Sequence, residues 1–243
     1  MLGTKITPYN KDKASKKEQV TKMFDSIAGR YDFLNHFLSL GIDIIWRKIA
    51  VREIAKINPE LILDIATGTG DLAIEVSRLK PTKIIGVDIS NNMLDVGRKK
   101  MKDKSLDKVI DMQYGDSENL YFKDNSFDAV TAGFGVRNFE NLNKGLSEMY
   151  RVMKVGGKLA ILEPAEPTTF PFKQLYGLYF KFILPFVGNF FSKDDFAYSY
   201  LPESVAAFPS RTAFIKELEK VGFKDSKFRS LTFGIAALYT ATK

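Results

Sequence analysis

Short apolar runs alternate with segments of helical periodicity through the middle of the chain. The runs are rich in Ile, Leu and Val, as expected of strands buried on both faces of a parallel sheet. They occupy residues 61–66, 83–88, 109–114, 127–133 and 158–163. Strands that alternate with helices predict an α/β fold, a doubly wound, Rossmann-like sheet. The helix before the fifth strand is expected to run to Met153 and to end at Gly156-Gly157.

The N-terminal part of the chain predicts helices that precede the sheet. Ser15 and Glu18 have the spacing of a capping box, and the residues after them are apolar at helical spacing. A second helix is expected from Asp43, as its N-cap, to about Ile57, where a proline follows. Residues 1–14 are expected to be disordered.

The strand–helix rhythm stops after residue 165. Residues 168–200 are dense in Phe and Tyr, and a helix then ends near Gly222. Two closing strands are expected near 226–231 and 235–241, as a strand inserted antiparallel beside its neighbour would require. We therefore expect one seven-stranded domain. Its parts are an N-terminal basic arm with a helical cover (1–57), a cofactor-binding core (58–165), an aromatic helical insertion or lid (166–205), and a C-terminal helix with a strand pair (206–243).

The amino-acid composition excludes several kinds of reactive site. The chain has 243 residues, 45% of them hydrophobic and 27% charged, which is ordinary for a soluble globular protein. The absence of cysteine excludes disulfides and thiol nucleophiles. The single histidine, His36, excludes any site that needs two imidazoles, and we expect no metal site. His36 itself is expected to be structural.

The net charge of +7 is concentrated at the N-terminus. Residues 1–30 hold seven Lys and Arg against three acids, a surplus of +4. Such an arm either contacts nucleic acid or anionic lipid, or is a solvated tail. The N-terminus is too polar for a secretory signal, and the longest apolar stretch, Phe180–Phe191, is interrupted by polar residues. These features predict a cytoplasmic protein without a membrane span.

A glycine loop follows the first predicted strand and opens a helix. It contains Asp64, Gly68, Thr69 and Gly70, and glycines there let the backbone approach a ligand closely. Asp88 ends the second strand, where its carboxylate can accept hydrogen bonds from both hydroxyls of a ribose. The other expected cofactor-binding residues lie at neighbouring strand ends. They are Ile89, Asp116, which is placed to sit beside an adenine amino group, Ser117 and Gly133.

The same loop also matches the dinucleotide fingerprint, so an NAD-dependent oxidoreductase is an alternative. Asp64 separates the two interpretations. A carboxylate beside a pyrophosphate is unfavourable, whereas the sulfonium and amino group of S-adenosylmethionine are cationic. The acids at 64, 88 and 116 therefore favour S-adenosyl-L-methionine as cofactor.

The loop and acidic residues resemble those of class I S-adenosylmethionine-dependent methyltransferases. Residues 31–46 (YDFLNHFLSLGIDIIW) resemble the first signature of the UbiE/MenG family, the menaquinone/ubiquinone C-methyltransferases. Residues 151–157, followed by Glu163, resemble the second signature, and residues 134–138 (FGVRN) match a third block. The resemblance covers residues 20–241. The family usually has His where Asp43 stands, Met at Leu34, Pro at Val155 and Ser at Ala165.

The resemblance implies methyl transfer to a ring carbon of a prenylated quinol, with demethylmenaquinol preferred. A benzoquinol, a small phenol and RNA remain alternative acceptors. Catalytic roles are implied for Tyr31, Arg137 and Asn138, with Arg137 stabilising a phenolate. The alternatives are a packed core tyrosine, an arginine paired to an acid, and a helix N-cap, respectively.

The aromatic segment at 168–200 has two interpretations. It is either a helical hairpin packed on the sheet or an apolar wall for a prenyl tail that also contacts a bilayer surface. With the substrate class implied above, we expect transient membrane contact at the inner face, no nucleic-acid partner, and a homodimer as an option.

Overall fold

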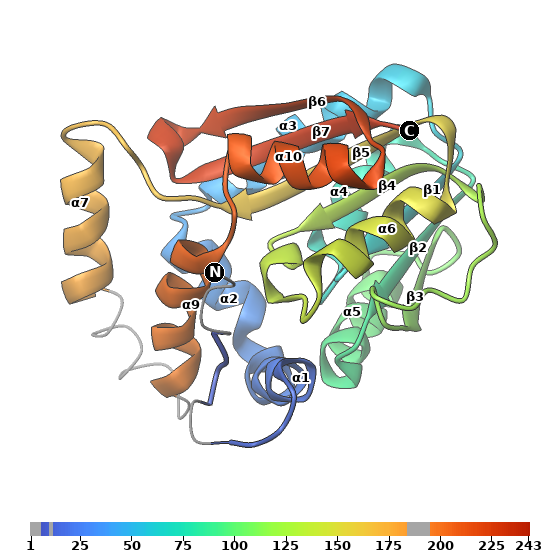
Figure 1. Ribbon diagram of the computed structural model, residues 1–243. Helices are drawn as coiled ribbons and strands as arrows, with labels where there is room; N and C mark the ends of the chain where they lie inside the picture. The colour runs from blue at the N-terminus through green and yellow to red at the C-terminus, as the bar shows by residue number, and fades with distance from the viewer. Residues whose placement is uncertain (1–5, 10–11, 184–194) are drawn as a thin grey trace.

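The computed structural model describes residues 6–9, 12–183 and 195–243. A seven-stranded sheet has the order β3-β2-β1-β4-β5-β7-β6 (Figure 1). Its strands are β1 (Leu61–Ile65), β2 (Lys83–Asp88), β3 (Ile110–Tyr114), β4 (Phe127–Gly133), β5 (Met153–Pro164), β6 (Lys224–Leu231) and β7 (Ala236–Thr242). The first five pair in parallel, and β7 runs antiparallel between β5 and β6, which confirms the fold class predicted from the sequence.

Helices cover both faces of the sheet. The described α-helices are α1 (Lys16–Ile27), α2 (Tyr31–Leu38), α3 (Ile42–Ile54), α4 (Asp71–Val76), α5 (Asn91–Asp103), α6 (Leu142–Val152), α7 (Phe172–Leu178), α9 (Asp195–Ala207) and α10 (Thr212–Val221). Helices α6 and α10 lie on one face and α3, α4 and α5 on the other (Figure 1). Each face therefore has its own apolar core.

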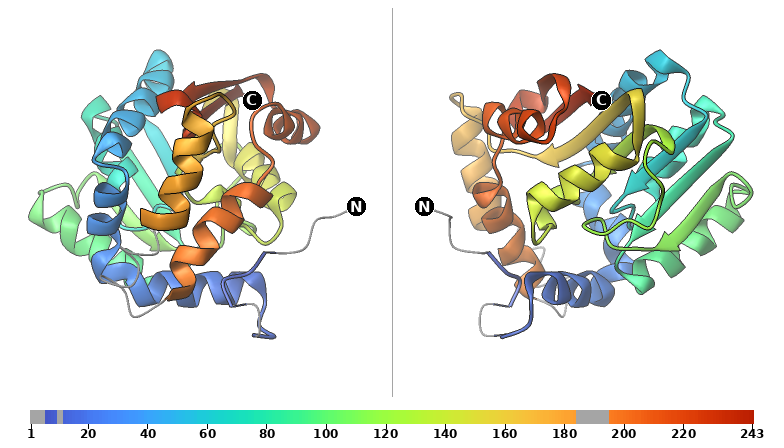
Figure 2. Two further views of the ribbon diagram at one scale, coloured as in Figure 1. Left: turned by 90° about the vertical axis from the view of Figure 1, so that its left-hand side faces the viewer. Right: turned by 45° about the vertical axis from the view of Figure 1, so that its right-hand side comes forward.

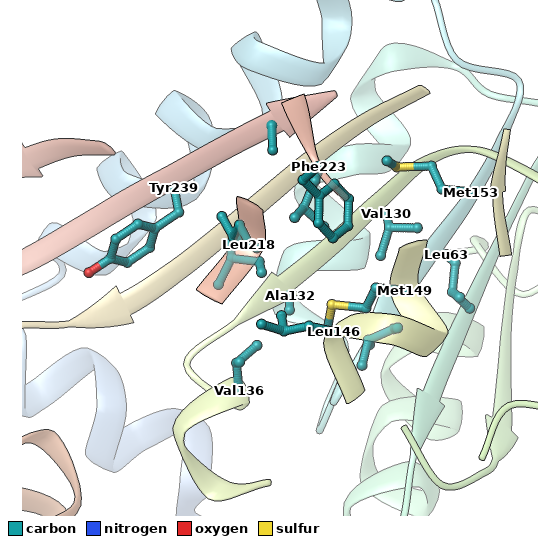
Figure 3. Packing of buried hydrophobic residues seen from close by; sticks show 14 of the residues in the cluster. Leu63, Val130, Ala132, Val136, Leu146, Met149, Met153, Leu218, Phe223 and Tyr239 are labelled. Atoms are coloured by element: carbon teal, nitrogen blue, oxygen red, sulfur yellow. The ribbon is translucent and has the colours of Figure 1, made fainter. Parts of the chain in front are cut away.

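The core under α6 and α10 shows why these segments fold as they do. Leu146, Met149 and Leu218 point from the two helices onto strand residues such as Val130 and Leu63 (Figure 3). All five are fully buried. Full burial of one such side chain stabilises the fold by about 1.5–3 kcal/mol. The apolar faces of the two helices thus pack against the apolar strands in one interface.

The remaining helices lie beyond the carboxyl ends of the parallel strands. Helix α1 begins at the predicted capping box: the Ser15 side chain accepts from the Glu18 N–H, and the Glu18 carboxylate accepts from the Ser15 N–H. It runs along the bottom of the molecule in both views of Figure 2. Helices α7 and α9 lie past the end of β5 (Figure 1). These elements enclose the space into which the strand ends point.

Three sequence expectations are corrected. Helix α6 ends at Val152, and Met153 already pairs with Phe127, so Gly156-Gly157 lies inside β5 rather than after the helix. The N-cap of α3 is Gly41, in a left-handed conformation, and Asp43 is buried inside the helix. The N-terminal arm is partly ordered, because Ile6 and Tyr9 pack on a cluster formed by α1 and α9, whereas residues 1–5 and 10–11 lie outside the described part.

Candidate active site

A pocket at the carboxyl ends of β1 to β4 collects most of the predicted cofactor residues. The predicted cofactor residues that line it are Gly68, Asp88, Ile89, Asp116, Ser117 and Gly133, and the predicted catalytic residues Tyr31 and Asn138 line it as well. They come from the ends of different strands and from α2, which is where ligands bind in open α/β sheets. The sequence expectation that these positions converge is therefore consistent with the fold.

Asp88 is held by backbone donors at the edge of this pocket. Its carboxylate accepts hydrogen bonds from the N–H groups of Gly68 at 2.8 Å and Ser90 at 2.9 Å. Burial raises the pKa of Asp88, and the backbone hydrogen bonds oppose that shift. The carboxylate is thus oriented by the glycine loop on one side and the start of α5 on the other.

Asp64 does not line the pocket. Its two carboxylate oxygens accept hydrogen bonds from Thr131 Oγ1 at 2.6 Å and Thr67 Oγ1 at 2.5 Å, and the residue is 1% exposed. Burial raises the pKa of Asp64 to about 6. The structure places this carboxylate beneath the loop, where it ties β1 to β4 and to the turn.

Thr69 and Gly70 also lie behind the pocket lining. The Thr69 hydroxyl donates to Asp32 of α2. Gly70 has φ +84°, and a Cβ there would come within 2.3 Å of the Met101 side chain. Both residues shape the turn, so their part in the site is to hold the loop in its conformation.

Sequence reasoning missed a cation inside the pocket. Lys17 of α1 lines it and lies 2.7 Å from Asp116 Oδ2 and 3.6 Å from Glu118. Partial burial would lower the pKa of Lys17, but the bond to Asp116 and the nearby carboxylates raise it overall. The only signal in the sequence was the basic arm, which folds back here onto the protein's own acids.

The donor set fits S-adenosyl-L-methionine. The Nδ2 atom of Asn138 is buried, lines the pocket and has no partner among the described residues, whereas its Oδ1 accepts from Tyr200 at 3.1 Å. A buried orphan donor is costly and indicates a missing acceptor. Gly135 allows close packing in the pocket wall, because a Cβ there would lie 2.4 Å from the Ala66 Cβ. The carboxylates of Asp88 and Asp116 match hydroxyl and amino donors.

Arg137 is paired to a buried acid, one of the two roles that the sequence left open. Its Nη1 lies 3.1 Å from Glu163 Oε2, and its Nε donates to Ser204 at 3.3 Å. The Glu163 side chain is fully buried and also accepts from the N–H of Val136 at 2.6 Å. The guanidinium nevertheless lines a second cavity, described next, so the pairing fixes a cation in a cavity wall.

A second, larger cavity adjoins the cofactor pocket. It has a volume of about 450 Å³ and shares Phe24, Tyr31 and Phe134 with the first pocket. Side chains of α7 and α9, including Tyr176 and Leu201, form part of its mostly apolar wall. Helix α7 has no fully buried residue, so this part of the aromatic segment is not packed tightly on the sheet. Residues 184–194 of that segment lie outside the described part.

The sheet order and the pocket at the strand ends are those of the class I methyltransferase fold. A structural relative is a SAM-dependent methyltransferase from Aquifex aeolicus, 17% identical, with a TM-score of 0.54 over 75% of this chain and 81% of that one. This likeness concerns the fold alone.

The sequence comparisons identify the family. The profile of the ubiE/COQ5 methyltransferase family matches residues 12–243, and the chain belongs to this family. The demethylmenaquinone methyltransferase of Bacteroides fragilis is 51% identical over 98% of both chains. The ubiquinone/menaquinone biosynthesis C-methyltransferase UbiE of Geotalea daltonii is 46% identical over 94% of this chain and 97% of that one. The protein is an S-adenosyl-L-methionine-dependent methyltransferase, and the oxidoreductase alternative is set aside.

Proposed function

We propose that the protein methylates a ring carbon of a prenylated quinol, with demethylmenaquinol as the acceptor. The observation that carries this proposal is the apolar cavity of about 450 Å³ that joins the cofactor pocket at Tyr31 and Phe134. A cavity of this kind suits a flat aromatic head and the start of an isoprenoid tail. Relatives near 50% identity carry the name demethylmenaquinone methyltransferase, which favours a naphthoquinol over a benzoquinol.

In this proposal the protein supplies alignment, exclusion of water and charge. The bound cofactor supplies an activated methyl group. Asp88 and Asp116 hold the adenosine hydroxyl and amino groups, and the orphan Nδ2 of Asn138 donates to the cofactor or the head group. Arg137 lies in the wall of the quinol cavity, where its charge stabilises the phenolate that makes the ring carbon nucleophilic.

The test is methyl transfer followed by mass spectrometry. One reaction receives S-adenosyl-L-methionine and reduced demethylmenaquinol, a second receives a prenylated methoxybenzoquinol, and a third receives a phenol without a prenyl tail. We expect a product one methylene heavier in the first reaction and little in the third. Equal rates for the tailed and tailless acceptors would contradict the role of the cavity. Product with the benzoquinol alone would reassign the acceptor. A fourth reaction that receives RNA tests whether RNA is the acceptor.

The cavity opens through exposed apolar side chains, which supports transient membrane contact. Leu40 and Leu175 both line the cavity, yet they are 83% and 56% exposed. Phe37 and Leu178, one turn away from them on α2 and α7, are also about half exposed. We define these four residues as the mouth patch. Among the described residues, none of the helices has the length and apolar character of a membrane span. Because its four apolar side chains are exposed, we propose that the mouth patch rests on the bilayer surface that holds the quinol.

Vesicle sedimentation tests this contact. Leu40→Asp and Leu175→Asp together should release the protein from vesicles of anionic phospholipid. Val155→Asp is a matched control, because Val155 is also 83% exposed. It lies near the start of β5, whereas the cavity lies at the end of that strand, where Pro164 lines it. If the mouth-patch variant and the control sediment alike, the mouth patch does not contact the bilayer.

A further inference from the structure

A polar stripe runs along one face of α2 inside the otherwise apolar cavity. Tyr31, Asn35 and the C-cap residue Ser39 follow one another at four-residue spacing, and all three line the cavity. Residues four apart lie on the same side of a helix. Burial raises the pKa of Tyr31 and a side-chain interaction with Asn35 opposes that shift, and Tyr31 also lines the cofactor pocket. The stripe therefore starts where the two cavities meet.

The stripe ends at a buried carboxylate. The Ser39 hydroxyl donates to Asp43 Oδ1 at 2.6 Å, and Asp43 lines the cavity although it is only 2% exposed. The other oxygen, Oδ2, contacts Arg47 and lies 2.8 Å from Nδ1 of His36. The His36 ring is not turned to aim an N–H bond at that oxygen. Because the outer torsion of histidine is broad, rotation of the ring brings the two into line.

His36 connects this buried carboxylate to solvent. Its side chain is 38% exposed, and its Nε2 lies 3.4 Å from Asp71 at the start of α4. The imidazole is absent from the cavity lining, so it faces outward while Asp43 faces inward. The Asp43–His36 pair thus spans the wall between the quinol cavity and bulk water.

The charged groups around His36 form one network. The charged groups of the network are Asp32, Asp43, Asp71, Arg47 and Lys100. Three carboxylates face two cations, so the network has a surplus of one negative charge while the imidazole is neutral. His36 lies among these groups, with Asp43 and Asp71 on its two ring nitrogens.

The pair includes a position at which this chain departs from the family pattern. Position 43 is usually His in the family that the sequence resembles, and here it is Asp43. In this structure the imidazole beside position 43 belongs to His36 of α2.

Quinol methylation must dispose of a proton. A ring carbon gains a methyl group, the methyl group arrives as a formal cation, and the carbon loses its hydrogen as a proton, so one proton is released per turnover. We infer that Asp43 and His36 form the exit for this proton: the Asp43 carboxylate, which lines the quinol cavity, accepts the proton there, and the proton passes from Asp43 to His36 and on to water. This inference rests on the proposed function. Neither residue lines the cofactor pocket, so they are relay and positioning groups.

The pH dependence of kcat tests the relay. With both substrates saturating, kcat of the native enzyme should rise with pH through the range in which an imidazole loses its proton. His36→Asn should remove this rise and lower kcat by about 100-fold, the lower end of the range for lost proton-transfer catalysis. Cofactor affinity, measured separately by calorimetry, should stay unchanged. Asp43→Asn should behave in the same way.

Two further variants separate the relay from a structural role. Lys100→Met removes a cation but keeps the imidazole, so the rise should move to higher pH rather than disappear. The exchange His36→Asp with Asp43→His restores the pair in reverse and should recover most of kcat. A folded exchange variant as slow as His36→Asn overturns the relay. So does a His36→Asn enzyme with native kcat and pH profile. A native enzyme that forms no methylated quinol instead overturns the proposed function.

Discussion

Lys17 and Asp116 join the N-terminal helix to the end of β3 across the cofactor pocket, with 2.7 Å between Nζ and Oδ2. The carboxylate expected to face an adenine amino group is therefore already partnered by a cation from α1. Neighbouring Lys16 donates to the carbonyl groups of Arg137 and Phe139 at 3.0 Å each. The start of α1 is thus fastened to both sides of the pocket.

We expect Lys17→Met to loosen α1. Both side chains are 31% exposed, and an ion pair near the surface contributes about 0.5–1 kcal/mol at most. Amide hydrogen exchange within α1 should then rise by roughly two- to fivefold. Lys22→Met is the control, because Lys22 is 69% exposed and its partner Asp12 lies 3.9 Å away. Equal effects of the two variants would mean that the pair does not hold the helix.

Asp88→Ala should weaken binding of S-adenosyl-L-methionine by at least tenfold, or about 1.4 kcal/mol. The carboxylate lines the pocket and is aimed by the N–H groups of Gly68 and Ser90. Calorimetric titration measures the affinity. Asp95→Ala is a suitable control, since Asp95 is 69% exposed on α5 and pairs only locally with Arg98. Unchanged affinity in Asp88→Ala would remove Asp88 from the cofactor site.

Asp64→Asn should change how stability depends on pH. The pKa of Asp64 is raised from 3.8 in the unfolded chain to about 6 in the folded protein, so folding favours its protonated form. Its contribution to stability is fully present below about pH 4 and is lost as pH rises through 6. Two pKa units correspond to about 3 kcal/mol. Relative to the native protein, the variant should gain up to that amount between pH 4 and 7, as measured by urea unfolding.

A control with the opposite sign is available for that experiment. The pKa of Asp128 is lowered: its burial is outweighed by hydrogen bonds from Lys154 and from the N–H groups of Leu61 and Glu60. Its contribution to stability is therefore lost as pH falls, and Asp128→Asn should lose rather than gain stability as pH rises. A parallel response of the two variants would be incompatible with the burial of Asp64.

Arg137→Ala should separate stability from turnover. Removing the cation leaves the buried Glu163 without its partner, which costs about 3–5 kcal/mol of the free energy of unfolding. Adding Glu163→Gln should restore much of that stability because no buried charge remains unpaired. Turnover should stay low in both variants, and cofactor affinity should stay nearly intact. If turnover returns together with stability in the double variant, the role of Arg137 is structural only.

The sequence was sufficient for the alternation of elements and for the convergence of most strand-end residues. Buried parallel strands are apolar throughout, and their carboxyl ends meet at one edge, so Asp88, Asp116 and Gly133 were predictable from local pattern. Asp64 was not, because the direction of its side chain depends on Thr131 of another strand. The same holds for Lys17, since nothing local to the basic arm indicates that it folds back onto Asp116.

Features that depend on residues close together in the chain could be predicted from the sequence, and features that depend on contacts between distant segments could not. Capping at Ser15, the apolar periodicity of α6 and the antiparallel closing strands were predictable from neighbouring residues or from general rules of strand pairing. The contact between His36 and Asp43, the pairing of Arg137 with Glu163 and the cavity beneath α7 and α9 arise where separate segments meet. Burial and pairing of charges depend on the whole packed chain, so only the tertiary structure decided which of these residues face a substrate and which face one another.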